Sequence, residues 1–424
     1  MNIVTYYFIF VYIFLQKNTI LKKYIEIQLL SWYNDFVDDE FFKIPSMNLM
    51  QGRKMEMKML FHEQQIDGVV NKICLSEPEI YVDNKKRGRS GHMGHALVEF
   101  APGKIMAFNA NTSAKRLQGH AAFGWMEYRI SEDYGKTWGD IYDFPYSKQE
   151  FFDGIHSVSV EKAVACDDGS IVVFCHLNTI DAPASCEPYD IPKYVISKDG
   201  GKSWSEAKDF SSFKGRIYDA VYYNKSIYVL EFCNDAKERF TGTQKEHLYR
   251  IFKSDDNGAS FYELSIVGFP KTLSRAYGNM VFSPEGKLMV YAYNEEDEKN
   301  MDCVISEDNG QTWNDYTKCF VKNKIRNPQI NILDNQYILH GRAGESEAGT
   351  GAFVMYTSAD GLNWDEGTIL VENRPASFYS NNLVLKFPDN KQRMLVQYSE
   401  NYNDPVKGVW NGQVNVMHLW IKTK

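Results

Sequence analysis

The chain has 424 residues and a formal net charge of −8, with 44% hydrophobic and 14% aromatic residues. This length and aromatic content are typical of one large all-β domain with an extension. No basic face is evident in the sequence, which argues against nucleic acid as a partner, so an anionic ligand needs a local cluster of arginines.

The first 56 residues differ from the rest of the chain. Residues 3–15 form a nearly unbroken apolar run, which is too short for a comfortable membrane span and lacks the basic start of a secretion signal. Three interpretations stay open: a helical anchor, an atypical signal peptide, or a segment upstream of a true start at Met55, Met57 or Met59. We expect residues 1–56 to lie outside the fold and one domain to span residues 57–424. Membrane contact is expected only if residues 1–16 are retained.

The seven cysteines are scattered and form no C-x-x-C pair. We therefore expect no metal site and no other cofactor. The odd count favours reduced thiols and a cytoplasmic protein. The alternative is a secreted or anchored protein, if the apolar run is a true signal.

Six units follow one another along the chain, each an alternating strand, a short turn and a second strand. The pairs are 96–100 with 105–108, 162–165 with 171–174, 220–223 with 227–230, 279–282 with 288–291, 329–332 with 337–340, and 383–385 with 394–397. Residues 414–420 supply a third strand for the last unit, and residues 79–82 are expected as its outer strand. The pattern predicts an all-β fold, a six-bladed β-propeller of four-stranded antiparallel blades.

A turn motif, S-x-D-x-G-x-T/S-W/F, follows each of the first five pairs. The copies begin at Ser131, Ser197, Ser254, Ser306 and Ser358, and the last copy is shortened. We expect the Asp carboxylate to accept hydrogen bonds from backbone N–H groups two residues on, and Gly to supply a positive φ. The aromatic ring is expected to be buried between neighbouring sheets.

The ligand site of a propeller is expected where first strands begin and second strands end, because both open on the same end of the channel. Polar residues gather at these positions. The strand starts hold Arg89, His92, His95, Asp153, His156, Glu161, Arg216, Tyr218, Asp219, Arg275, Tyr277, Arg326 and Tyr379. The strand ends hold Asn109, Asn111, His176, Glu231, Tyr293, Arg342, Tyr398 and Glu400. The set predicts a site for an anionic, hydroxyl-rich ligand, because Arg pairs bidentately with a carboxylate.

Several of these residues have a plainer interpretation. Arg216 and Arg275 are equally compatible with solvated loop positions. Glu231 belongs either to the channel, which is favoured, or to a sheet edge. His92 and His95 are either metal ligands or neutral hydrogen-bonding rings, and the second is favoured.

The turn copies and the six units, over about residues 77–424, resemble the sialidase (neuraminidase) superfamily. The copies are similar to the Asp boxes of that superfamily, which are typical of the architecture and not of an activity. The resemblance implies a Tyr nucleophile assisted by Glu, an Asp acid/base and three arginines that clamp a substrate carboxylate. Residues 378–383 resemble the nucleophile segment, which makes Tyr379 the candidate, and Arg342 resembles the third clamp arginine.

The sequence departs from the superfamily pattern at the other positions. The Arg-Ile-Pro of the first blade falls on residues 93–95, and the acid/base falls near His120. The Glu and second Arg of the fourth blade fall near Tyr277 and Tyr293. An Arg-x-Pro occurs instead in the fifth blade, at residues 326–328. One hypothesis is that arginines at other positions form the clamp, together with a carboxylate at another position. The arginines are then Arg216, Arg275, Arg326 and Arg342, and the carboxylate is Glu231 or Asp219.

The sequence thus predicts a sialidase-like exo-glycosidase that removes a terminal sugar, expected to be an acidic one of the sialic-acid type, with a glycan or sialoside as its partner. Its catalytic candidates are Tyr379, Glu231, Asp219 and His120, and its substrate-binding candidates are Arg342, Arg326, Arg216, Arg275, Tyr218, Tyr277, His92 and His95. One alternative is a glycan-binding propeller without hydrolysis, motivated by the missing positions. Another is a glycosidase for a different sugar that uses His92, His95, His120 or His176 as acid or base.

Overall fold

The computed structural model describes residues 61–64, 73–118, 121–179, 190–233, 248–270, 275–294, 297–343, 351–373, 378–400 and 412–423. The expected extension over residues 1–56 lies outside these ranges, so its boundary stays a prediction. Within the described ranges no helix is long and apolar enough to cross a membrane.

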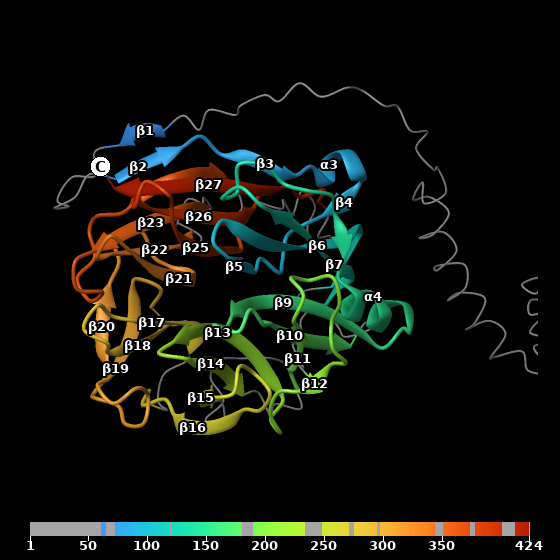
Figure 1. Cartoon of the computed structure of the whole chain (residues 1–424). Helices are drawn as coiled ribbons and strands as arrows, with labels where there is room; N and C mark the ends of the chain where they lie inside the picture. The colour runs from blue at the N-terminus through green and yellow to red at the C-terminus, as the bar shows by residue number, and fades with distance from the viewer. Residues whose placement is uncertain are drawn as a thin grey trace, which may run out of the picture. The chain divides into compact units, whose positions relative to one another are not determined.

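Six antiparallel sheets form the blades of a propeller, which confirms the predicted fold (Figure 1). The strands of blade one are β4 (Arg89–Ser90), β5 (Leu97–Ala101), β6 (Lys104–Gln118), β7 (Ala121–Ser131) and β8 (Tyr142–Asp143). Those of blade two are β9 (His156–Ala165), β10 (Ile171–Thr179), β11 (Lys193–Ser197) and β12 (Lys208–Asp209). Those of blade three are β13 (Gly215–Tyr223), β14 (Ser226–Cys233), β15 (Leu248–Ser254) and β16 (Tyr262–Ile266).

The last three blades repeat the same order. The strands of blade four are β17 (Arg275–Phe282), β18 (Leu288–Asn294), β19 (Asn300–Ser306) and β20 (Thr317–Phe320). Those of blade five are β21 (Arg326–Leu333), β22 (Gln336–Ala343), β23 (Gly351–Ser358) and β24 (Thr368–Asn373). Those of blade six are β25 (Ser380–Lys386), β26 (Gln392–Ser399), β27 (Val416–Thr423), β1 (Phe61–Gln64), β2 (Ile73–Ser76) and β3 (Glu79–Val82). Two helices join the described strands, α3 (Asn84–Arg87) and α4 (Pro145–Phe152).

Both ends of the domain build blade six, and this closes the ring. Strand β27 near the C-terminus pairs with β26 on one side and with β2 and β3 on the other. The expected outer strand, residues 79–82, is therefore confirmed as β3, and β2 adds a second N-terminal strand. In the pairing of β2 with β27, Cys74 lies opposite Lys422. Each first strand contacts the next around the ring, and β25 of blade six contacts β5 of blade one.

The five motif copies fold into the same turn. In the first copy Asp133 accepts hydrogen bonds from the Thr137 backbone N–H (2.8 Å) and hydroxyl (2.6 Å), while the Gly135 N–H donates to Ser131 Oγ (2.8 Å). In the first four copies the Asp carboxylate accepts from the N–H four residues on, and not two as expected, because the Ser hydroxyl takes the nearer donors. Gly135 has a φ of 76°, in the left-handed region.

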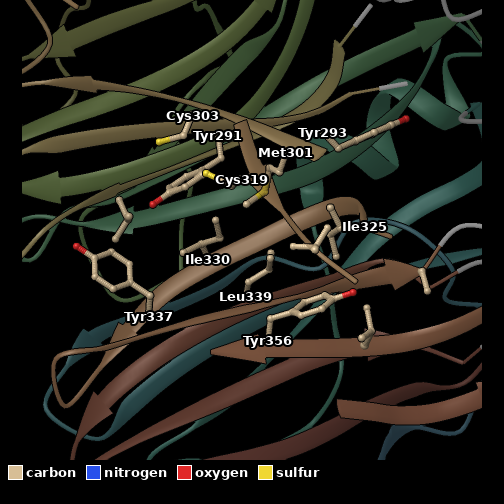
Figure 2. Packing of buried hydrophobic residues seen from close by; sticks show 14 of the residues in the cluster. Tyr291, Tyr293, Met301, Cys303, Cys319, Ile325, Ile330, Tyr337, Leu339 and Tyr356 are labelled. Atoms are coloured by element: carbon tan, nitrogen blue, oxygen red, sulfur yellow. The ribbon is translucent and has the colours of Figure 1, made fainter. Parts of the chain in front are cut away.

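The aromatic residue of each turn packs against the preceding blade, as expected. Trp204 of blade two joins the core of blade one beside Phe108, and Phe261 of blade three packs on Phe174 of blade two. The interface of blades four and five is filled in the same way by Tyr291, Leu339 and neighbouring residues (Figure 2). A separate hydrophobic cluster therefore fills each interface between neighbouring blades around the ring.

Candidate functional site

The mouth is defined here as the end of the ring where first strands begin and second strands end. In blades two to five the first strand carries a bulge close to the mouth, seen as a shift in its register with the second strand. The residues left out of the pairing are Glu161, Tyr218, Tyr277 and the pair Asn327–Pro328. A bulge re-aims its side chain and is over-represented beside active sites. Tyr277 has a φ of +46°, a conformation that costs about 1–3 kcal/mol for a non-glycine residue.

Three of these blades meet at Arg216, whose side chain is buried. Its Nη2 donates to Glu161 Oε1 at 2.6 Å, and its Nη1 donates to the Tyr277 hydroxyl at 3.3 Å. The guanidinium carbon lies 4.8 Å from the Tyr277 ring centroid and 5.5 Å from that of Tyr218. His176 Nδ1 lies 3.5 Å from Glu161 Oε1. Arg216 therefore holds a carboxylate and two phenol rings in one arrangement.

A second group lies where blade five meets blade six. Arg326 and Arg342 are direct partners in the pairing of β21 with β22. The Arg342 guanidinium carbon lies 5.8 Å from the Tyr379 ring centroid, and that of Arg326 lies 5.7 Å from the ring of Tyr293. Arg326 also forms an ion pair with Glu298, with 3.0 Å between Nε and Oε1. Burial lowers the pKa of Arg326, but Tyr293 and Glu298 more than offset this and the net shift is upward.

Tyr277 joins the two groups. Its ring centroid lies 6.1 Å from that of Tyr293 and 6.4 Å from that of Tyr379. The combined set is called the mouth cluster below. Its members are Glu161, Arg216, Tyr218, Tyr277, Tyr293, Arg326, Arg342 and Tyr379. Like charges directly opposite on neighbouring strands are destabilising, so the Arg326–Arg342 pair is suited to an anion that lies between them.

The structure brings six of the predicted site residues into this cluster and places the others elsewhere. Arg216 and Arg275 are buried, so neither is a solvated loop residue. Arg275 donates to Asp302 Oδ2 and to the Pro270 carbonyl, both at 2.6 Å, within blade four. Glu231 is also fully buried, and its Oε1 accepts from the Ser211 hydroxyl at 3.0 Å within blade three.

Asp219 lies deeper in the channel. Its Oδ1 is 3.0 Å from Lys162 Nζ, and its Oδ2 accepts from Asn279 Nδ2 at 2.5 Å. Lys162 also donates to Gln329 Oε1 (2.9 Å) and Asn381 Oδ1 (2.8 Å). These five residues, from blades two to six, form what is called the channel ring below. A cavity of about 390 Å³ is lined by four of the five ring residues, all but Gln329, and by the strand segments that follow them.

The predicted histidines are buried or outside the described residues. His92 Nδ1 lies 3.3 Å from Ser90 Oγ, and His95 Nδ1 lies 3.3 Å from Gln397 Nε2. Burial lowers the pKa of His92 to about 4 and that of His95 to about 3. Both rings are therefore neutral near pH 7. No set of three metal-binding side chains occurs in the described ranges. His120 lies outside them.

Glu161 and Tyr293 belong to the mouth cluster but were not chosen from the sequence as site residues. Both stand at predicted mouth positions, Glu161 at a strand start and Tyr293 at a strand end. The signal that selects Glu161 is its bulge, since Val160 and Lys162 on either side pair with Cys175 and Phe174. A bulge of this kind is not visible in a pattern of alternating residues.

Comparison with solved structures places the fold beside that of sialidases. A protein of unknown function from Dyadobacter fermentans is similar with a TM-score of 0.61 at 14% identity, over 83% of this chain and 99% of that one. The Hadza microbial sialidase Hz136 has a TM-score of 0.56 at 13% identity, over 83% of this chain and 70% of that one. The intramolecular trans-sialidase of Ruminococcus gnavus has a TM-score of 0.52 at 12% identity, over 78% of this chain and 95% of that one. No protein-family model and no curated protein matches the sequence. At these identities the likeness shows the fold alone.

Proposed function

We propose that this protein is a sialidase-like exo-glycosidase that removes a terminal acidic sugar from glycans. The observation that carries the proposal is the adjacency of Arg326, Arg342 and Tyr379 at the mouth. Two guanidinium groups on paired strands suit a sugar carboxylate, which each can bind with parallel hydrogen bonds. The phenol beside them is then within the same ligand's reach.

The chemistry assigned to Tyr379 follows from the charge of this substrate. A carboxylate nucleophile is repelled by a sugar that carries its own carboxylate, whereas a neutral phenol is not. The Tyr379 oxygen forms a bond to the anomeric carbon and the phenolic proton passes to a base. The glycosidic C–O bond breaks, and its electron pair leaves with the departing oxygen, which takes a proton from solvent. Water then replaces the tyrosine at the same carbon, and free sugar is released.

Hydrolysis of 4-nitrophenyl glycosides of acidic sugars, sialosides first, tests the proposal. Tyr379→Phe should lower kcat by about 100-fold or more, since it removes the nucleophile. Arg342→Lys should raise KM by roughly tenfold, because one bidentate contact is lost. Tyr142→Phe is the matched control, since this tyrosine is exposed on β8. A wild-type protein inactive on every acidic glycoside would refute the proposal.

A binding protein without hydrolysis is the second candidate. It is favoured by the phenols of Tyr277 and Tyr293, which stand where the superfamily resemblance implies a Glu and an Arg. Calorimetric titration with the same acidic sugars distinguishes the two. Binding that weakens in Arg342→Lys, without product release from any glycan, supports the second candidate, and measured turnover ends it.

A further inference from the structure

The ammonium group of Lys162 is matched by three oxygens of the channel ring. Its Nζ lies 3.0 Å from Asp219 Oδ1, 2.9 Å from Gln329 Oε1 and 2.8 Å from Asn381 Oδ1. An ammonium has three donors, so these contacts fill its hydrogen-bonding capacity. The Lys162 side chain is 13% exposed and that of Asp219 is 3% exposed. Lys162 is therefore placed to hold other residues and not to bind a ligand itself.

The other residues of the channel ring extend this network around the channel. Asp219 Oδ2 accepts from Asn279 Nδ2 at 2.5 Å, and Asn279 Oδ1 accepts from the Ile330 N–H of blade five at 2.9 Å. Asn381 Nδ2 donates to the Glu161 carbonyl at 2.9 Å. The network thus links blades two, three, four and five in order, and it joins blade six back to blade two.

Each residue of the channel ring lies close in sequence to a residue of the mouth cluster. The two residues are at most three positions apart, on the first strand of the same blade or just before it. The pairs are Glu161 with Lys162, Tyr218 with Asp219, Tyr277 with Asn279, Arg326 with Gln329, and Tyr379 with Asn381. The main chain between such close residues has little freedom to change its length, so a ring residue that shifts carries its mouth neighbour with it.

Lys162 also connects the two halves of the mouth cluster. One half lies around Arg216 in blades two and three, and the other contains Arg342 and Tyr379 in blades five and six. At the mouth the halves are joined through Tyr277, whose ring centroid lies 6.4 Å from that of Tyr379. Below the mouth Lys162 is hydrogen-bonded directly to blades five and six. Hydrogen bonds are more strictly directional than a ring contact, so Lys162 fixes the spacing of the halves.

We propose that Lys162 is a positioning residue of the reaction proposed above, on which this inference rests. Through Asn381 it holds Tyr379 at a fixed distance from the carboxylate site of Arg326 and Arg342. The two arginines are paired within blade five and keep their own spacing without Lys162. Loss of the ammonium therefore leaves the arginine pair intact and displaces the nucleophile relative to it. A displacement of about 1 Å is enough to slow a reaction by about 100-fold.

The test uses the full chain and the acidic 4-nitrophenyl glycoside that the wild type hydrolyses best. Lys162→Met should lower kcat by about 100-fold while KM stays within about threefold, because the carboxylate site is kept and the nucleophile is displaced. This variant also leaves the buried Asp219 carboxylate without its counterion, so its urea midpoint should fall. Lys104→Met is the matched control, since Lys104 forms an exposed ion pair with Glu132, and it should change neither kcat nor the midpoint.

The double variant Lys162→Met/Asp219→Asn separates positioning from folding. It leaves no unpaired charge, and the amide at position 219 keeps an oxygen that accepts from Asn279 Nδ2 and the Met280 N–H, as the carboxylate does. We expect the urea midpoint to recover towards that of the wild type, because removing both charges of a buried pair costs far less than removing one. The kcat should stay low, because the contacts to Gln329 and Asn381 are still missing.

Three outcomes would overturn the inference. A kcat of the double variant within about threefold of wild type shows that the ring only supports folding, and the proposed function then stands. A KM that rises tenfold or more in both Lys162 variants shows that the carboxylate site depends on the ring as well, which again leaves the proposed function in place. A wild-type protein inactive on every acidic glycoside overturns the inference and the proposed function together.

Discussion

Buried histidines mark the interior of this propeller. His92, His95, His340 and His418 are all buried. Burial lowers the pKa of each below its ordinary value, to about 4 for His92 and about 3 for His95 and His340, with Lys162 a further cause at His340. At His418 burial acts together with Arg129 and His95. Four neutral rings are therefore part of the folded state near pH 7.

Acid should unfold the protein through these residues. Because their folded pKa is depressed, the unfolded chain binds protons first as pH falls below its ordinary histidine pKa of about 6.5. The stability is fully present above about pH 6.5 and is lost towards pH 4, on the order of 3 kcal/mol for each of His92, His95 and His340. The free energy of unfolding, measured by denaturant titration between pH 7 and pH 4, should fall over this range. In His95→Gln the fall should be smaller, and an unchanged slope would contradict the assignment.

The mouth residues show where sequence reasoning succeeds and where it stops. Tyr379 and Arg342 were chosen because short segments around them resemble a known pattern, and the structure places them side by side, while their role stays a prediction. Glu161 was not chosen, because its position depends on a one-residue bulge that places Glu161 at the mouth and Lys162 in the channel. Asp219 is an aspartate, the residue type of the catalytic acid that the resemblance implies. Its place in the channel ring is visible only from its contacts with Lys162 and Asn279.

At the scale of elements, the strand pairs and turns were predictable because they repeat. Each alternating pair lies within two paired strands of one blade, and the positions of Ser, Asp and Gly recur in the first four turns, while the fifth turn is one residue shorter between Asp and Gly. The partners of the Asp carboxylate were not predictable, since the Ser hydroxyl competes for the same donors. Helix α4 was also missed, because eight residues without clear apolar periodicity give no helical signal.

One turn should be worth a measurable part of the stability. Asp133 accepts from the Thr137 N–H and hydroxyl and from the Ser131 hydroxyl, so Asp133→Ala leaves three donors without their acceptor. We expect the free energy of unfolding to fall by roughly 1–2 kcal/mol. Asp140→Ala, in the exposed segment after the same turn, is the control and should change it by less than about 0.5 kcal/mol. Equal effects of the two variants, measured in urea, would show that the turn contacts are dispensable.

At the scale of the whole molecule, closure of the ring depends on the pairing of β27 with β2 and β3. Cys74 on β2 lies opposite Lys422 on β27, so Lys422→Cys places two thiols at the close separation that a disulfide requires. We expect the oxidised variant to melt at a higher temperature than its reduced form, because the bond closes a very long loop of the unfolded chain. Lys422→Ser is the control. A Cys74 thiol that stays reactive after oxidation would contradict the pairing of these two strands.

The channel ring has a consequence for how a ligand can enter and leave the channel. The Lys162 ammonium binds side chains of three other blades, so a ligand at the mouth cannot pass along the channel beyond the ring without breaking these contacts. For the proposed function this means that only the end of a glycan chain enters the channel. If the protein is the glycosidase proposed above, its product and its next substrate share one opening and compete for it.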